Sequence, residues 1–167
     1  DASYYYHNEL GKKRIVLHFT AGQISGDFWA LTQKNNHVST AFLMGRDGTI
    51  YKLFPNTKYW SYHIGRPTVG GNTKMSQSSI GIEISNWGPL REDGRGGLVT
   101  WDHGYWFCNL DQTDAYIKID TPFREASYFA AITDQQYDNI ISLLRYLTQE
   151  FNIPTNFLEE GKRDQLF

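Results

Sequence analysis

The stretch RIVLHFTAG, residues 14–22, places a histidine, His18, at the end of an apolar run. A second stretch, SIGIEISN, residues 79–86, places one carboxylate, Glu83, among aliphatic residues. Apolar, β-branched runs of this length are typical of interior β-strands, where a charged or metal-binding side chain is costly unless it is paired or takes part in chemistry. The two stretches therefore predict one polar cleft in a β-sheet, with both side chains opening onto it.

The overall composition fits one folded domain and excludes several classes of protein. A chain of 167 residues can bury a full core without covalent staples. The one cysteine, Cys108, excludes an internal disulfide framework and a cysteine-rich zinc module. The net charge of −2, without a basic stripe, argues against nucleic acid as a partner. No apolar stretch approaches the roughly 20 residues of a membrane span.

The other strands are predicted from turn chemistry and alternation. Residues 40–45 and 49–54 flank Asp47-Gly48, and this pair supplies the positive φ angles of a tight hairpin turn. Residues 88–124 are glycine-rich and are predicted to be irregular, with short strands at about 98–101, 105–107 and 115–119. We expect this segment to be an insertion in a single domain that covers residues 1–167.

Two helices are predicted from capping residues and apolar periodicity. Asp27 is expected to cap a short helix over residues 28–34. The clearest helix covers residues 133–151, where Thr133 and Gln136 form a capping box ahead of an apolar stripe. Strands separated by helices, together with a hairpin, predict an α/β fold with a mixed central sheet flanked by helices.

His18 and Glu83 each have a chemical and a structural interpretation. Neutral imidazole is the commonest zinc ligand, and a strand end would mount it rigidly, but His18 could equally be a core histidine bonded to a backbone carbonyl. Alternation along the strand puts Glu83 on the face opposite the isoleucines, with small neighbours that leave room for a ligand. Glu83 could orient or deprotonate a water there, or it could be an exposed side chain on an edge strand.

A loop of aromatic residues offers a possible binding surface. Trp60, Tyr62 and His63 lie in a segment, residues 55–77, that is predicted to be loop-like. Flat rings with polar tips are used to hold sugars and peptides, although they also serve as plain loop packing.

Five motifs, in this order, resemble those of the zinc-dependent N-acetylmuramoyl-L-alanine amidases, a family that includes phage lysozyme-like amidases and peptidoglycan recognition proteins. The likeness covers about residues 14–87, and the helix at 133–151 falls where that family carries its long helix. The motifs are IVLHFTAG at 15–22, VSTAFL at 38–43, RDGTIY at 46–51, YHIG at 62–65 and SIGIE at 79–83.

The resemblance implies a fold, a reaction and a set of residues. The fold would be the amidase or peptidoglycan recognition protein fold. The family hydrolyses the amide between N-acetylmuramic acid and the L-alanine of the stem peptide, so the partner would be peptidoglycan or muropeptides and the location secreted or periplasmic. His18 matches the first zinc ligand, and Glu83 matches the general base that acts on the zinc-bound water. The residues expected to contact substrate are Trp60, Tyr62, His63, Asn86 and Trp87.

The sequence also departs from the family pattern. The family places a second histidine ligand after the long helix and an Asp or Cys ligand beyond it, but no histidine follows His103. The tail GKRD at 161–164 is only a faint match to the end of the pattern. One imidazole cannot hold zinc in a site that needs three protein ligands.

Three hypotheses therefore stay open at this stage. In the first, the chain is a fragment that lacks its C-terminal strand and two ligands and is nearly inactive alone. In the second, it is a non-catalytic module that binds muramyl peptides without a metal. The third hypothesis is a structural or toxin-like interaction module.

Overall fold

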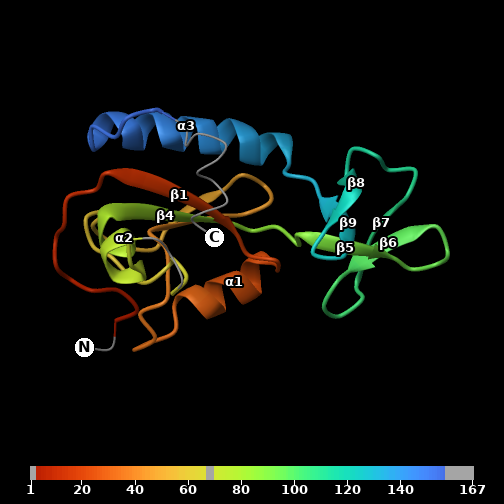
Figure 1. Cartoon of the computed structure of the whole chain (residues 1–167), viewed down its shortest axis with the longest axis horizontal. Helices are drawn as coiled ribbons and strands as arrows, with labels where there is room; N and C mark the ends of the chain where they lie inside the picture. Colours follow the sequence, from red (N-terminus) through yellow and green to blue (C-terminus); the bar gives the residue numbers. More distant parts are fainter. Residues whose placement is uncertain (1–2, 67–69, 157–167) are drawn as a thin grey trace.

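The computed structural model describes residues 3–66 and 70–156. Its elements form a central body with a second sheet beside it (Figure 1). The helices are α1 (Ile24–Leu31), α2 (Asn72–Ser78) and α3 (Asp134–Glu150). The strands of the central sheet are β1 (Arg14–Phe19), β2 (Phe42–Met44), β3 (Ile50–Lys52) and β4 (Ser79–Ile84). Those of the second sheet are β5 (Pro89–Glu92), β6 (Gly97–Thr100), β7 (Trp106–Asn109), β8 (Tyr116–Phe123) and β9 (Ala126–Ala130).

The central sheet is mixed, which confirms the predicted fold class. Its strand order is β1-β4-β2-β3, with β4 parallel to both β1 and β2 and with β3 antiparallel to β2. Glu83 is the register partner of His18 on one side and of Leu43 on the other. The predicted hairpin is present, and Gly48 at its turn has a φ of +80°, a value that glycine adopts without strain.

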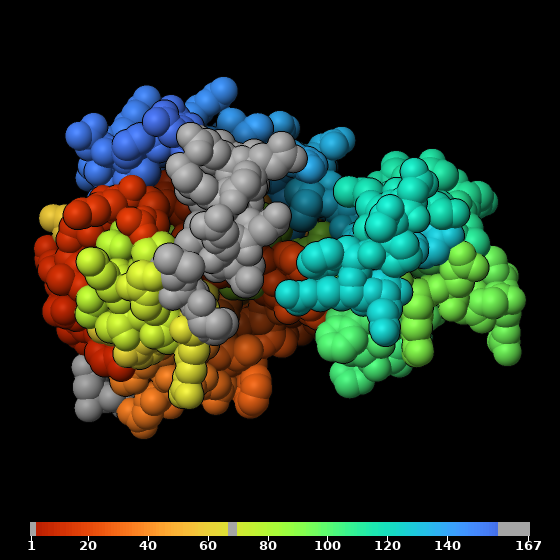
Figure 2. Space-filling model, viewed as in Figure 1, coloured from red at the N-terminus to blue at the C-terminus, as the bar shows by residue number. Residues whose placement is uncertain are grey.

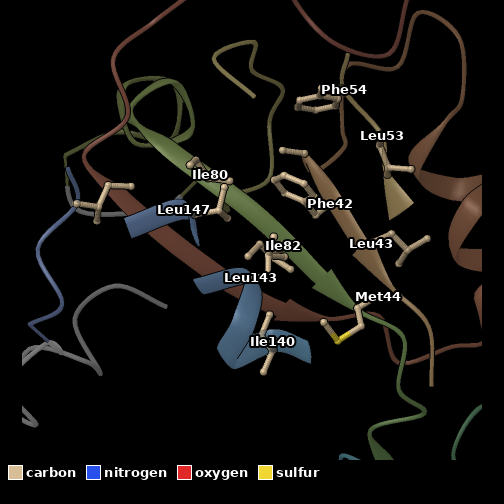
Figure 3. Packing of buried hydrophobic residues seen from close by; sticks show 12 residues of the cluster. Phe42, Leu43, Met44, Leu53, Phe54, Ile80, Ile82, Ile140, Leu143 and Leu147 are labelled. Carbon is tan, nitrogen blue, oxygen red and sulfur yellow. The ribbon is translucent and has the colours of Figure 1, made fainter. Parts of the chain in front are cut away.

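The main core lies between α3 and one face of the central sheet. Ile80 and Ile82 of β4 are buried against the apolar stripe of α3, formed by Ile140, Leu143 and Leu147 (Figure 3). The predicted capping box begins this helix, since the Thr133 hydroxyl accepts from the Gln136 backbone N–H and the Gln136 side chain accepts from the Thr133 N–H. This packing leaves the other face of β4, with Gly81 and Glu83, for polar groups.

The short helix after β1 begins earlier than the sequence predicts. It spans Ile24–Leu31 with Gln23 at its N-cap, so Asp27 is not the cap but a buried residue within the helix. Figure 1 shows α1 and α3 on opposite sides of the central sheet. A further helix, α2, occupies part of the segment predicted to be loop-like. Both differences bring polar residues to the face of the sheet that α3 does not cover.

The segment predicted to be irregular is instead an ordered antiparallel sheet. The five strands pair in the order β7-β6-β5-β9-β8 and have their own small core of Leu90, Leu98, Cys108 and Ala130. Two of these strands, β5 and β9, were not predicted. The second sheet projects from one end of the central body (Figures 1 and 2).

Asn86 joins the two sheets at the point where the chain leaves β4. Its side-chain amide donates to the carbonyls of Ala130 and Ala131, and its oxygen accepts the backbone N–H of Gly88 at 2.7 Å. Arg46, in the β2–β3 turn, also donates to Ala131 and lies over the Phe107 ring. In the described part of the chain, no helix is long and apolar enough to cross a bilayer.

Candidate functional site

His18 and Glu83 lie side by side on neighbouring parallel strands. Because they are register partners, their side chains leave the sheet on the same face. This is the face away from α3, since Ile80 and Ile82 point toward that helix. The structure therefore places the imidazole and the carboxylate in one site, as the sequence predicts.

A second imidazole, that of His63, completes a chain of hydrogen bonds across the site. Nε2 of His18 lies 3.0 Å from Nδ1 of His63. Nε2 of His63 lies 2.9 Å from the hydroxyl of Ser79, and that hydroxyl donates to the carbonyl of Met75 at 2.6 Å. The chain links β1 to the start of β4 and to the last turn of α2.

Gly81 makes the space that the His63 ring occupies. A Cβ at this position would lie 2.9 Å from Cγ of His63 and 2.9 Å from Cγ2 of Thr40. Such distances are well inside van der Waals contact, so a larger residue would displace the ring. Gly81 is therefore required because its lack of a side chain makes room for the His63 ring, and not because of its backbone conformation.

Burial keeps both imidazoles neutral. It lowers the pKa of His18 below its ordinary value. For His63, burial and the neighbouring His18 and Lys12 charges lower the pKa to about 3. Near neutral pH each ring thus carries one hydrogen and one lone pair.

The opposite shift occurs at Glu83. Burial, and to a lesser degree the nearby Asp27 carboxylate, raise its pKa to about 7. A carboxyl group with such a pKa is present in both protonation states near neutral pH, which suits a group that accepts and returns a proton.

Asp27 is the carboxylate that the sequence analysis treated only as a helix cap. It is 6% exposed, and its Oδ2 atom has no hydrogen-bond partner in the part of the chain that the structure describes. Burial raises the pKa of Asp27, although hydrogen bonds from Ser85 and Thr20 oppose the shift. The apolar residues beside it in the helix, Ile24 and Phe28, are the signal in the sequence that Asp27 lies near the core.

A cavity of about 610 Å³ lies beside His63, between the segment that carries this residue and the start of α2. Its wall includes two of the residues predicted to contact substrate, Tyr62 and His63, together with Arg66, Asn72 and Thr73. Contact of Tyr62 and His63 with substrate stays a prediction, and the cavity is where it would occur.

The other predicted substrate-contacting residues lie elsewhere. Trp60 is 6% exposed, stacks on Tyr6 and donates its indole N–H to Asn8. Asn86 is 2% exposed and bonds to backbone groups at the junction of the two sheets. Trp87 is half-buried against the core of the second sheet. Since Trp60 and Asn86 have no face open to a ligand, we leave them out of the proposed contact set.

The described residues do not by themselves complete a zinc site. Among residues 3–66 and 70–156, no group of three histidine, cysteine, aspartate or glutamate side chains is arranged to hold a metal ion. His18 supplies one imidazole, whereas zinc sites in enzymes have three protein ligands. The GKRD tail at 161–164 lies outside the described residues.

Two solved structures share the fold of this chain. One is the N-acetylmuramyl-L-alanine amidase AmiD from E. coli in complex with the substrate anhydro-N-acetylmuramic acid-L-Ala-D-gamma-Glu-L-Lys. It matches with a TM-score of 0.55 and 20% identity, over 86% of this chain and 45% of that chain. Another is AmpDH3 from Pseudomonas aeruginosa in complex with anhydromuramic pentapeptide, with a TM-score of 0.54 and 18% identity, over 89% of this chain and 49% of that chain.

These likenesses establish an amidase fold, and the chain spans just under half the length of either structure. The sequence places it more closely: residues 10–158 match the N-acetylmuramoyl-L-alanine amidase family, and the chain belongs to that family. No curated protein sequence gives a significant match.

Proposed function

We propose that the protein hydrolyses the amide bond between N-acetylmuramic acid and the L-alanine of peptidoglycan. The observation that carries this proposal is the placement of His18 beside Glu83, a carboxyl group whose pKa is raised to about 7, in a chain of the amidase family. The fold relatives named for a muramyl-peptide substrate or ligand support the same substrate class. Such a substrate would imply a secreted or periplasmic location.

Glu83 has the properties of the proton-transfer group for this reaction. As the carboxylate it accepts a proton from a water molecule, and the water oxygen forms a bond to the lactyl carbonyl carbon. The carbon–nitrogen bond then breaks, and the protonated Glu83 returns the proton to the leaving nitrogen of L-alanine. The products are the free lactyl carboxyl group and the free amine of the stem peptide. Asp27, which raises the pKa of Glu83, would act through it.

Zinc is the cofactor that the family resemblance implies, and His18 is the ligand that we propose for it. A bound zinc ion would polarise the scissile carbonyl and lower the pKa of a water molecule. Because no group of three suitable side chains is present among residues 3–66 and 70–156, at least one further ligand would have to come from outside them. The role proposed for Glu83 does not depend on the metal ligands, because it rests on the burial of Glu83 and on its position beside His18.

One observation favours a second function. A module that binds muramyl peptides without cleaving them would need the cavity beside Tyr62 and His63 but no metal, and the described residues supply the cavity alone. Hydrolysis predicts that free stem peptide is released, whereas non-catalytic binding predicts that none is released.

The test is to incubate protein expressed from its complete reading frame with anhydromuramyl peptides, with added zinc or with a chelator. Mass spectrometry should detect free stem peptide in the wild type and much less with Glu83→Gln. If calorimetry shows binding of the muramyl peptide and no stem peptide is released, the non-catalytic binding module is favoured. If the protein neither binds nor cleaves the peptide, the structural or toxin-like interaction module is favoured.

A further inference from the structure

The chain of hydrogen bonds from His18 to the Met75 carbonyl can run in only one direction. A carbonyl oxygen accepts and never donates, so the Ser79 hydroxyl must give its one hydrogen to Met75 at 2.6 Å. The reverse arrangement would put two acceptors at that distance with no hydrogen between them, which is repulsive. Ser79 therefore has only lone pairs left for His63.

It follows that His63 carries its hydrogen on Nε2. This nitrogen lies 2.9 Å from the Ser79 oxygen and must donate to it. The half-buried ring fills the space that Gly81 leaves beside β4, and near neutral pH it is the neutral form with a single hydrogen. Its Nδ1 atom is then an acceptor.

The same reasoning fixes His18. Its Nε2 atom lies 3.0 Å from the acceptor Nδ1 of His63, so Nε2 of His18 must bear a hydrogen. A neutral imidazole with a hydrogen on Nε2 has its lone pair on Nδ1. The hydrogen bond to His63 uses Nε2 and leaves Nδ1 of His18 out of the chain.

We propose that His63 and Ser79 are positioning residues that hold His18 as the Nε2–H tautomer and leave Nδ1 as its electron-pair donor. Metal-binding histidines commonly give their second N–H to a fixed acceptor, which sets both tautomer and ring orientation. Here the acceptor is the imidazole of His63, and Ser79 in turn sets the tautomer of His63. That Nδ1 of His18 binds an electrophile such as a metal ion rests on the proposed function. The tautomer of His18 follows from the hydrogen bonds and does not depend on that function.

The direct experiment is ¹⁵N–¹H correlation spectroscopy of the histidine side chains in the metal-free protein at neutral pH. His18 and His63 should each show a protonated Nε2 and an unprotonated Nδ1. An Nδ1–H tautomer at either residue in the wild type would overturn the proposal. This measurement requires neither substrate nor metal, so an inactive protein that shows both tautomers as expected would count against the proposed function alone.

Variants at the two ends of the chain separate positioning from simple packing. Ser79→Ala should let His63 sample both tautomers and should broaden or shift its resonances. Ser78→Ala is the matched control, since the neighbouring hydroxyl donates to the carbonyls of Lys74 and Met75 and not to an imidazole of the described residues. Equal spectra for Ser79→Ala and wild type would contradict the role of Ser79.

A pair of substitutions at His63 tests its effect on His18. His63→Leu removes the acceptor while keeping an apolar side chain of similar size, so His18 should become a mixture of tautomers. His63→Asn restores an acceptor near the position of Nδ1, and should return His18 to the Nε2–H form. If His18 were unchanged in His63→Leu, His63 would be a packing residue only.

Discussion

The two sheets of this chain place carboxylates in opposite environments. On the central sheet, burial raises the pKa of Glu83 to about 7. In the turn between β5 and β6 of the second sheet, Asp93 is fully exposed, and the backbone N–H groups of Arg95 and Gly97 lower its pKa. The interior parallel strand of the central sheet, β4, is buried at five of its six residues, whereas an antiparallel sheet can leave one face in water.

The difference also extends to the aromatic and apolar residues. Trp101, Tyr105 and Trp106 on and beside the second sheet are more than half exposed, whereas the β4 isoleucines of the central sheet are buried. The comparison teaches that the candidate chemistry lies on and beside the most completely buried strand, β4. The second sheet is therefore expected to influence the reaction only through the way it is joined to β4.

The largest expected effect comes from exchanging one carboxylate on each sheet. Glu83→Gln removes the proton-transfer group and should reduce the rate of stem-peptide release by about 10²–10⁴-fold. Glu92→Gln, on β5, removes an exposed carboxylate that accepts from Tyr128, and should leave the rate unchanged. The measurement is kcat/KM on a muramyl peptide. Equal losses for the two variants would break the distinction between the sheets.

A leucine-to-alanine substitution should destabilise the main core more than the core of the second sheet. Leu147 and Leu98 are both fully buried, the first in the large core under α3 and the second in the four-residue core of the second sheet. Leu147→Ala should lower the free energy of unfolding by about 4–5 kcal/mol, and Leu98→Ala by about 2–3 kcal/mol, because the smaller core can relax around the gap.

Urea denaturation gives these free energies, and hydrogen exchange shows where they act. Leu98→Ala should accelerate exchange in residues 89–130, while the amides of β1 and β4 stay protected. Faster exchange throughout the central sheet in Leu98→Ala would show that the two sheets unfold as one unit.

The raised pKa of Glu83 predicts a pH-dependent difference in stability. The folded protein holds this proton up to about pH 7, whereas the unfolded chain releases it near the ordinary value of 4.5. The group therefore favours the folded state at low pH, and its contribution is lost as the pH rises through this range. Glu83→Gln should match the wild type near pH 4 and exceed its stability by up to about 3 kcal/mol at pH 8.

The measurement is denaturant unfolding of both proteins from pH 4 to pH 8. The lowered pKa of His63 acts in the opposite direction, since the buried ring destabilises the fold as the pH falls below its ordinary value. That contribution is common to both proteins and cancels in their difference. A constant difference across the range would show that Glu83 titrates normally.

The sequence was sufficient for the features that depend on local pattern. Alternation in β4 put Glu83 on the face opposite Ile80 and Ile82, and register then brought it beside His18. The capping box of α3 and the hairpin at Asp47-Gly48 depend on residues a few positions apart. Both are present, although only Gly48 of that pair has a positive φ.

What the sequence did not predict depends on contacts between distant segments. The partnership of His63 with His18 spans 45 residues, and nothing near His63 indicates it. Asp27 resembles a capping residue, but Gln23 begins α1 and turns Asp27 inward. The helix α2, NTKMSQS, has no apolar stripe to predict it. Strand β5 pairs with β9, about 40 residues later, so neither was evident from its own residues.

The smallest effect in this series tests the joint between the sheets. Asn86→Ala would leave the carbonyls of Ala130 and Ala131 and the N–H of Gly88 without their side-chain partner. The loss of these buried bonds should cost about 1–3 kcal/mol of unfolding free energy and should accelerate exchange in β5 and β9. Asn109→Ala, at an exposed position of β7, is the control and should change neither. If Asn86→Ala instead raised KM and left stability intact, Asn86 would contact the substrate, as the sequence predicts, and the joint would have to be held by other groups such as Arg46.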